Sequence, residues 1–170
     1  DDPTATPQFN LIPSFGYPSS DNLLAARFEE DSPSVPIGRI AAFTPDMVRQ
    51  YLKKVQDMEA IQQNAGQTIE EKAWMKNVLH LGGGDLPIQN FIKNRLEDMG
   101  DSLSQSKFGA NVFALYKSST NAVQQAGVED VTRFINQGLS WITFFGHSAP
   151  STLDFDIGDP NQYSNTGRYP

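Results

Sequence analysis

The chain has 170 residues, of which 38% are hydrophobic and 19% are charged, so it is long enough and apolar enough to bury a core. Its formal net charge is −7 and it has no cluster of Lys and Arg, which argues against a nucleic-acid partner. It contains no cysteine, which excludes disulfides, thiolate zinc sites and a thiol nucleophile within these residues.

The longest apolar run, Trp141 to Phe145, is too short to span a membrane, and the N-terminus does not read as a signal peptide. Both ends resemble the interior of a longer sequence. We therefore expect this chain to be an excised segment of a longer parent protein.

The chain is predicted to form one partial domain with a loop-rich segment at 1–34 and an α/β portion at 35–170, because Pro, Ser, Asp and Asn are frequent in its first part. Residues 35–40 suggest a short strand or extended segment. A helix should begin at Pro45, with Thr44 as its N-cap. Apolar residues recur in this helix at helical spacing, namely Val48, Tyr51, Leu52, Val55 and Met58.

Strands and helices should alternate through the rest of the chain. The predicted elements are a strand at 77–81, a helix from Ile88 to Met99 that stops at Gly100, a strand at 111–116, a helix from Val128 to Ile135 that ends at Gly138, and a strand at 139–145. The last strand is apolar on both faces, as expected of a central parallel strand. This order predicts a three-layer α/β sandwich with a mostly parallel sheet.

Ligands of open parallel sheets bind beyond the carboxyl ends of the strands, and two sequences lie there. The first is Gly82–Gly84 followed by Asp85, and the second is Gly146-His147-Ser148. A His oriented by a carboxylate is the base half of a nucleophilic triad. The other histidine, His80, lies inside a strand pattern and is interpreted as a core or face residue.

Each candidate has a simpler alternative. Asp85 is also a plausible helix N-cap, with Pro87 in the first turn. The triple glycine is compatible with a phosphate cradle and hence a nucleotide-binding domain, although Asp85 would repel a phosphate and no Gly-x-Gly-x-x-Gly is present.

An acidic segment follows the last predicted strand. Asp154, Asp156 and Asp159 around Gly158 form either a calcium loop or a solvated acidic turn, and the EF-hand pattern is not met. No metal site is assigned, and no cofactor is expected apart from this candidate calcium. No Gly-x-Ser-x-Gly is present, which argues against a serine hydrolase.

Four stretches together resemble the gingipain family of cysteine peptidases. They are the early loop Tyr17-Pro18-Ser19-Ser20-Asp21-Asn22, the segment Val35-Pro36-Ile37-Gly38-Arg39-Ile40 followed by a helix, the strand at 78–81 with its small-residue turn and acid, and the stretch from Val131 through Ser148. In the last stretch a helix ends in Asn136-Gln137-Gly138 and an aromatic strand leads to Gly146-His147. The family has an "N-x-G" helix end, then a strand and "G-H-G".

The resemblance implies a caspase-like α/β fold and a Cys-His cysteine endopeptidase that forms an acyl-enzyme with a polypeptide substrate. It matches His147 with the catalytic His and Asp85, loosely, with the acid that orients it. Gly146 would allow close approach of the backbone, and Ser148 replaces the second Gly of "G-H-G" near the oxyanion site. The resemblance also implies a secreted, periplasmic or cell-surface location, and some members act as sortase-like enzymes of a secretion system.

The nucleophile is the missing part of this prediction. We expect the cysteine to lie C-terminal to Pro170, so that this fragment alone is inactive and depends on the rest of the parent chain. The rival interpretation is a non-catalytic binding or structural module with the same fold. The triad interpretation also predicts that His147 and Asp85 lie at one edge of the sheet, within about ten ångströms of each other.

Overall fold

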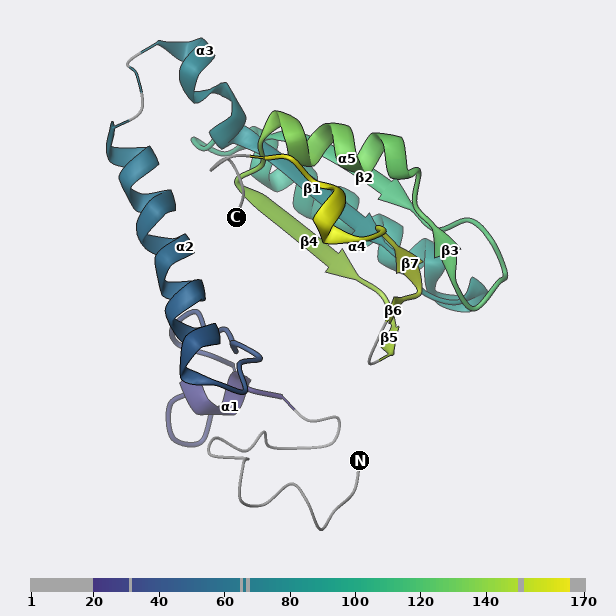
Figure 1. Cartoon of the computed structure of the whole chain (residues 1–170). Helices are drawn as coiled ribbons and strands as arrows, with labels where there is room; N and C mark the ends of the chain where they lie inside the picture. The colour runs from purple at the N-terminus through teal and green to yellow at the C-terminus, as the bar shows by residue number, and fades with distance from the viewer. Residues whose placement is uncertain (1–19, 31, 65, 67, 150–151, 166–170) are drawn as a thin grey trace. The chain divides into compact units, whose positions relative to one another are not determined.

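The computed structural model describes residues 20–30, 32–64, 66, 68–149 and 152–165 (Figure 1). Its contacts divide the chain into two compact units, Asp1–Tyr51 and Leu52–Pro170. The predicted division at residues 34 and 35 stays a prediction.

The first unit contains α1 (Asn22–Ala25) and the beginning of α2 (Pro45–Asn64). The Arg39 guanidinium donates two hydrogen bonds to Asp21, at 2.7 Å from Nε to Oδ2 and 2.6 Å from Nη2 to Oδ1. This bidentate pair joins the early loop to the Gly-Arg segment, two of the four stretches that resemble the gingipain family. Residues 36–40 form no strand, and the part of the early loop before Ser20 lies outside the described residues.

Helix α2 begins at Pro45 as predicted, and the hydroxyl of Thr44 accepts a hydrogen bond from the amide of Met47 at 3.3 Å. No described residue of α2 is buried, so its apolar residues Val48, Tyr51, Leu52 and Val55 are exposed. The chain continues through α3 (Ile69–Lys72), which starts with a capping box between Thr68 and Glu71, and then η1 (Ala73–Lys76).

The second unit is built on three parallel strands in the order β2-β1-β4. They are β1 (Asn77–Gly82), β2 (Asn111–Tyr116) and β4 (Trp141–Phe145). Strand β1 is almost entirely buried in the middle, which confirms the predicted buried strand. The prediction that the last strand is central is wrong for the described residues: β4 is an edge of this sheet, and Trp141 is 55% exposed.

Short strands follow the sheet. Parallel β3 (Gln124–Gln125) pairs with β7 (Phe155–Asp156), and antiparallel β5 (Ser148–Ala149) pairs with β6 (Thr152–Leu153). The last element is η2 (Pro160–Gln162). These short pairings bring the segment after β4 back to the ends of the main strands.

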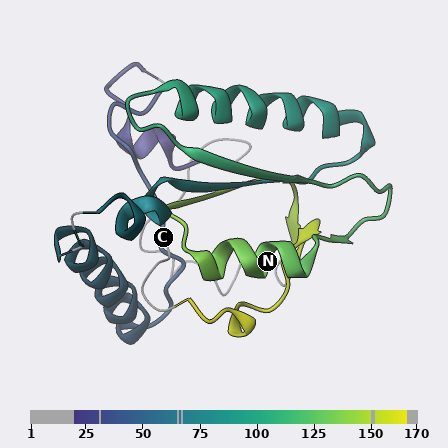
Figure 2. The same ribbon diagram turned by 90° about the horizontal axis from the view of Figure 1, so that it is seen from above.

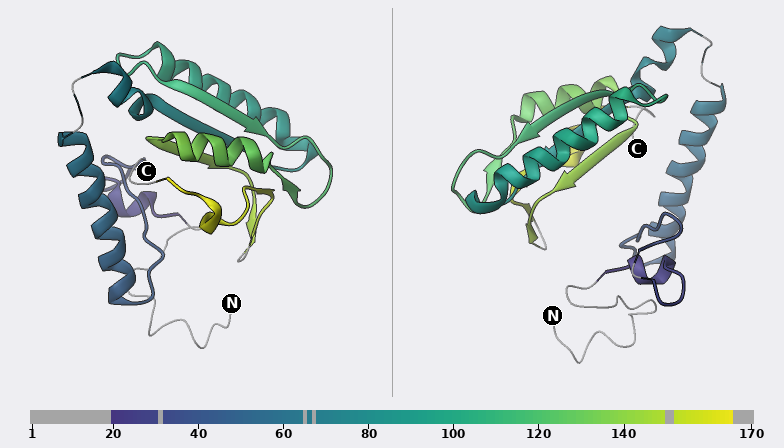
Figure 3. Two further views of the ribbon diagram at one scale, coloured as in Figure 1. Left: turned by 45° about the horizontal axis from the view of Figure 1, so that its top comes forward. Right: turned by 180° about the vertical axis from the view of Figure 1, so that it is seen from behind.

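One helix covers each face of the sheet, which confirms the predicted three-layer α/β fold (Figure 2). Helix α4 (Leu86–Gln105) lies in front of the strands in the right-hand view of Figure 3, and α5 (Val128–Gln137) lies behind them. Helix α5 ends at Gly138 as predicted, because Gly138 has φ 101° and only glycine adopts this conformation easily.

The predicted end of the first of these helices at Gly100 is wrong, since α4 continues to Gln105. Gly100 is buried inside the helix, and a Cβ at this position would be 3.2 Å from Cγ1 of Val112 on β2. This glycine therefore allows the helix to approach the sheet closely. A local helix-ending signal was outweighed by tertiary packing.

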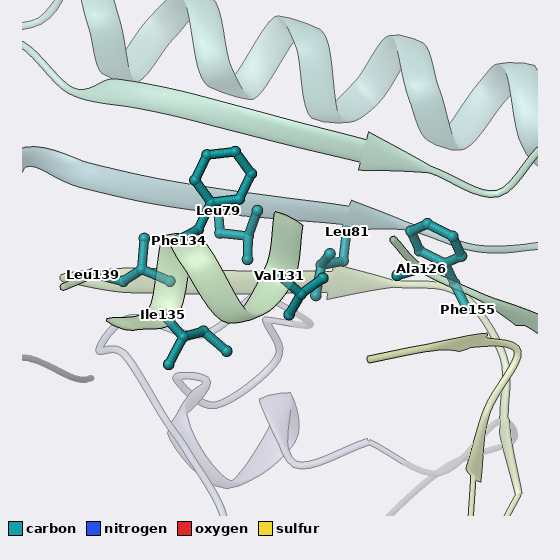
Figure 4. Packing of buried hydrophobic residues seen from close by; sticks show 8 residues of the cluster. All are labelled: Leu79, Leu81, Ala126, Val131, Phe134, Ile135, Leu139 and Phe155. Carbon is teal, nitrogen blue, oxygen red and sulfur yellow. The ribbon is translucent and has the colours of Figure 1, made fainter. Parts of the chain in front are cut away.

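The hydrophobic core lies between the sheet and α5 (Figure 4). Alternate residues of the parallel strands point to this face, and the rings of Phe113 and Phe134 stack with centroids 4.2 Å apart. The buried cluster comprises Leu79, Leu81, Ala126, Val131, Phe134, Ile135, Leu139 and Phe155. The core therefore fixes the strands whose carboxyl ends carry the candidate site.

Candidate functional site

The carboxyl ends of the three main strands are joined by backbone hydrogen bonds. The amide of Gly83 donates to the carbonyl of Phe145 at 2.8 Å, and the amide of Lys117 donates to the carbonyl of Gly82 at 2.7 Å. The loops that follow β1, β2 and β4 therefore start from one edge of the sheet. The candidate site residues were predicted from the sequence to lie at this edge.

His147 follows β4 after one residue, Gly146, and its side chain is exposed. Its amide donates a hydrogen bond to Oδ1 of Asp154 at 3.1 Å, and its carbonyl accepts one from the amide of Asp154 at 2.9 Å. The imidazole makes no hydrogen bond or ion pair with any described residue. The main chain of His147 is thus held while its side chain is available to a partner.

Asp85 lies at the same edge, because it follows β1 as His147 follows the neighbouring β4. It is the N-cap residue of α4, but its carboxylate does not cap the helix, and its carbonyl accepts from the amides of Ile88 and Gln89. The side chain is exposed and has no hydrogen bond to His147 among the described residues. Its role as the acid that orients the His stays a prediction.

Asp154 is the residue that joins these loops, and the sequence analysis assigned it only to a candidate calcium loop or a solvated acidic turn. The residue is 7% exposed, and its Oδ2 accepts a hydrogen bond from the amide of Gly84 at 2.6 Å. Nζ of the buried Lys117 is 3.7 Å from the same oxygen. The apolar neighbours Leu153 and Phe155 were the available sign that this carboxylate is buried.

Two glycines at this edge are explained by Asp154. A Cβ on Gly83 would be 2.2 Å from its Oδ1, and a Cβ on Gly146 would be 2.6 Å from the same oxygen. The same Cβ on Gly146 would also be 2.9 Å from the Cα of Gly83. The close approach expected at Gly146 therefore occurs between loops of this chain. Ser148 is exposed and lies in the short hairpin of β5 and β6, and a role of either residue at an oxyanion site stays a prediction.

The three carboxylates of the candidate calcium loop have separate hydrogen-bond partners. Asp156 accepts from the amide of Gly158, and Asp159 accepts from the amide of Asn161 at the start of η2. Asp154 binds the loops after β1 and β4. Within the described residues, no group of three or more His, Cys, Asp or Glu side chains is placed to hold a metal ion.

The glycine turn after β1 is poorly suited to a phosphate. The Gly83 amide donates to Phe145, and the Gly84 amide donates to the buried carboxylate of Asp154. A phosphate at this turn would have to displace that carboxylate and would be repelled by it. The nucleotide-binding alternative therefore gains no support from the geometry of this turn.

His80 is fully buried in β1, which confirms its interpretation as a core residue. Burial lowers the pKa of His80 below its usual 6.5, because the charged imidazolium is disfavoured away from water. Neither ring nitrogen has a hydrogen-bond partner among the described residues. His80 lies inside the sheet and is separate from the His147 loop.

The whole chain, residues 1–170, matches the family model described as Peptidase family C25, so the chain belongs to this family, the gingipain family. This confirms the resemblance found in the sequence. No curated protein and no solved structure matches the chain.

Membership in family C25 indicates a peptidase domain, generally of the cysteine type, whose substrate is a polypeptide. Members of the family are typically extracellular or attached to the cell surface. Among the described residues, no helix is both long enough and apolar enough to cross a membrane.

Proposed function

We propose that this chain supplies the histidine half of a Cys-His catalytic pair in a cysteine endopeptidase. His147 is the catalytic histidine, and the nucleophile is a cysteine of the parent protein that lies C-terminal to Pro170. The observation that carries the proposal is an exposed imidazole, on a clamped backbone, at the carboxyl edge of the sheet in a C25 chain.

The proposed reaction assigns one proton to His147 in each step. The imidazole takes the thiol proton, and the thiolate attacks the carbonyl carbon of the scissile peptide bond. The imidazolium then gives that proton to the leaving amine, which leaves a thioester acyl-enzyme. Water attacks the thioester with His147 as the base, and the carboxylic acid and free thiol are released. Asp85 is the candidate acid for orienting the imidazole, and Gly146 and Ser148 are candidates for contacts near the oxyanion.

The test uses the parent protein, in which the proposal places the cysteine after Pro170. A peptidyl chloromethyl ketone or a thiol-directed epoxide is added, and the adduct is mapped by mass spectrometry. We expect one cysteine to be labelled rapidly at neutral pH, and the rate to fall at least about 100-fold in His147→Ala, because the thiolate is no longer favoured. His80→Leu is the matched control: it removes the other histidine and should label at the wild-type rate.

The opposite result has a definite meaning. If no cysteine is labelled, or if labelling is equally fast without His147, the proposed peptidase mechanism is wrong. The fold would then serve as a non-catalytic binding or structural module, which is the second candidate function.

The acyl-enzyme also allows a protein-processing role, because an amine can replace water in the second step. We propose a secreted or surface location on the basis of the family, and a sortase-like transfer reaction is the extension of that proposal. Adding a peptide with a free N-terminal amine and searching for the ligated product distinguishes transfer from hydrolysis.

A further inference from the structure

The backbone of His147 is held on both sides of its Cα by a single residue, Asp154. The carboxylate of Asp154 accepts the hydrogen bond from the His147 amide, and the amide of Asp154 donates to the His147 carbonyl. The two peptide groups that flank the His147 side chain are therefore fixed together. Since an ionised acceptor forms stronger hydrogen bonds than a neutral one, the carboxylate is the stronger part of this clamp.

The same carboxylate connects the His147 loop to the end of the central strand. Its second oxygen accepts from the amide of Gly84, in the turn that leads to Asp85. Gly83 and Gly146 lie against this carboxylate too closely for any side chain at either position. Asp154 therefore sets the distance between the loop that carries His147 and the loop that carries Asp85.

A buried lysine balances the charge of this carboxylate. The side chains of Lys117 and Asp154 are only 1% and 8% exposed. Nζ of Lys117 also donates to the carbonyl of Ala122 at 3.2 Å, within the loop after β2. Buried charges in proteins are normally paired, because an isolated one is costly to desolvate. Because Lys117 directly follows β2, the ion pair links the end of β2 to the loops after β1 and β4 that Asp154 holds.

We propose that Asp154, paired with Lys117, is a positioning residue that sets the location of the catalytic imidazole through the main chain of His147. The inference rests on the proposed function of His147. It assigns a task distinct from that of Asp85, which remains the candidate for contact with the imidazole itself. The polypeptide substrate need not touch Asp154, which is buried.

The test compares the parent protein with Asp154→Asn, in which one carboxylate oxygen is replaced by an NH2 group that cannot accept a hydrogen bond. The rate of thiol alkylation is measured from pH 5 to pH 9. In the wild type the reactive thiolate should persist well below the ordinary thiol pKa of about 8.5. In Asp154→Asn the pH profile should move toward that of His147→Ala, and the rate of thiol alkylation at pH 6 should fall on the order of 100-fold.

Two controls separate positioning from loss of stability. Val131→Ala removes buried apolar atoms from α5, outside the strand-end loops, and Asp156→Asn changes a carboxylate two residues from Asp154 that, among the described residues, accepts a hydrogen bond only from Gly158. Both should keep the wild-type pH profile at temperatures well below unfolding. If Val131→Ala shifts the profile as much as Asp154→Asn does at an equal loss of melting temperature, the positioning role is overturned.

A second measurement does not depend on catalysis. Amide hydrogen exchange at His147 and Gly84 should become at least about tenfold faster in Asp154→Asn, while amides in the middle of β1 remain unchanged. A wild type without a reactive thiol would refute the proposed function alone, since exchange would still report the clamp. Unchanged exchange at His147 would refute the clamp even if the peptidase is active.

Discussion

The two faces of the sheet are each covered by one helix, yet they differ in how completely they are packed. On the α5 face, apolar side chains form a continuous buried cluster with stacked Phe113 and Phe134. On the α4 face, the ring nitrogens of His80 and the hydroxyl of Thr143, which pair across β1 and β4, find no hydrogen-bond partner among the described residues. Trp141 and Phe145, on the same strand as Thr143, are 55% and 40% exposed.

This difference indicates a division of tasks between the faces. Apolar burial on the α5 face is the main source of stability, because it removes the most hydrocarbon from water. The α4 face has unpartnered buried polar groups that lower stability, and one of them, the imidazole of His80, responds to pH. The effects of mutations on the free energy of unfolding should therefore differ between the two faces in size, in sign and in their dependence on pH.

The largest effect is expected from Phe134→Ala. Phe134 is 8% exposed and stacks on Phe113, so truncation leaves a cavity inside the core. The free energy of unfolding should fall by about 3–5 kcal/mol, measured by urea denaturation with tryptophan fluorescence. Phe91→Ala is the matched control on the other face. Phe91 is 53% exposed, so this change should lower the free energy of unfolding by less than about 1 kcal/mol. Equal losses would contradict the proposed division.

A smaller effect is expected from acid, acting through His80. Since burial lowers the pKa of His80 in the folded protein, the unfolded chain binds its proton more readily. The stabilising contribution of the neutral imidazole is complete above about pH 6.5 and is lost as the pH falls, by at most about 1.4 kcal/mol per pH unit. Between pH 7 and pH 5 we expect the free energy of unfolding to drop on this account, by at most about 2 kcal/mol.

Two variants assign this acid response to one of the two histidines. His80→Leu should remove most of the loss between pH 7 and pH 5, because no group is left to take up the proton in the unfolded state. His147→Ala should keep the loss, since the His147 side chain is exposed. Denaturation curves at several pH values decide the matter, and an unchanged acid response in His80→Leu would show that another group is responsible.

The parts of the fold that the sequence predicted correctly are those that depend on neighbouring residues. The boundaries of β2 follow from a local run of apolar residues, and the end of α5 follows from Gly138, whose positive φ requires glycine. The prediction failed at Gly100, where helix packing on β2 outweighs the local signal, and at β4, where an apolar run is at an edge of the described sheet.

The same reasoning explains what was found at the candidate site. The position of His147 at this edge could be predicted because parallel topology brings the carboxyl ends of strands to one edge, and the order of elements reveals that topology. Asp154 could not be assigned, because its partner Gly84 is 70 residues away in the sequence. The nearby Asp156 and Asp159 made it part of a candidate calcium loop or a solvated acidic turn, and only the folded chain shows which backbone groups its carboxylate binds.

The smallest predicted effect is a gain in stability from Gly100→Ala. Alanine favours a helix interior over glycine by about 1 kcal/mol. The new Cβ would be tight against Val112 at 3.2 Å, but a cavity of about 280 Å³ beside Gly100, Val112 and Ala114 gives the valine methyl group room to shift. We therefore expect the free energy of unfolding to rise by about 0.5–1 kcal/mol, again by urea denaturation.

Gly138→Ala is the matched change at the end of α5, and it should have the opposite sign. Gly138 has φ 101°, so a side chain there strains the backbone, and the free energy of unfolding should fall by about 1 kcal/mol or more. A loss in both variants would mean that Gly100 is packed too tightly to accept a methyl group. The α4 face would then be as closely packed around β2 as the α5 face is around β1, and the difference between the faces would reduce to the unpartnered polar groups of His80 and Thr143.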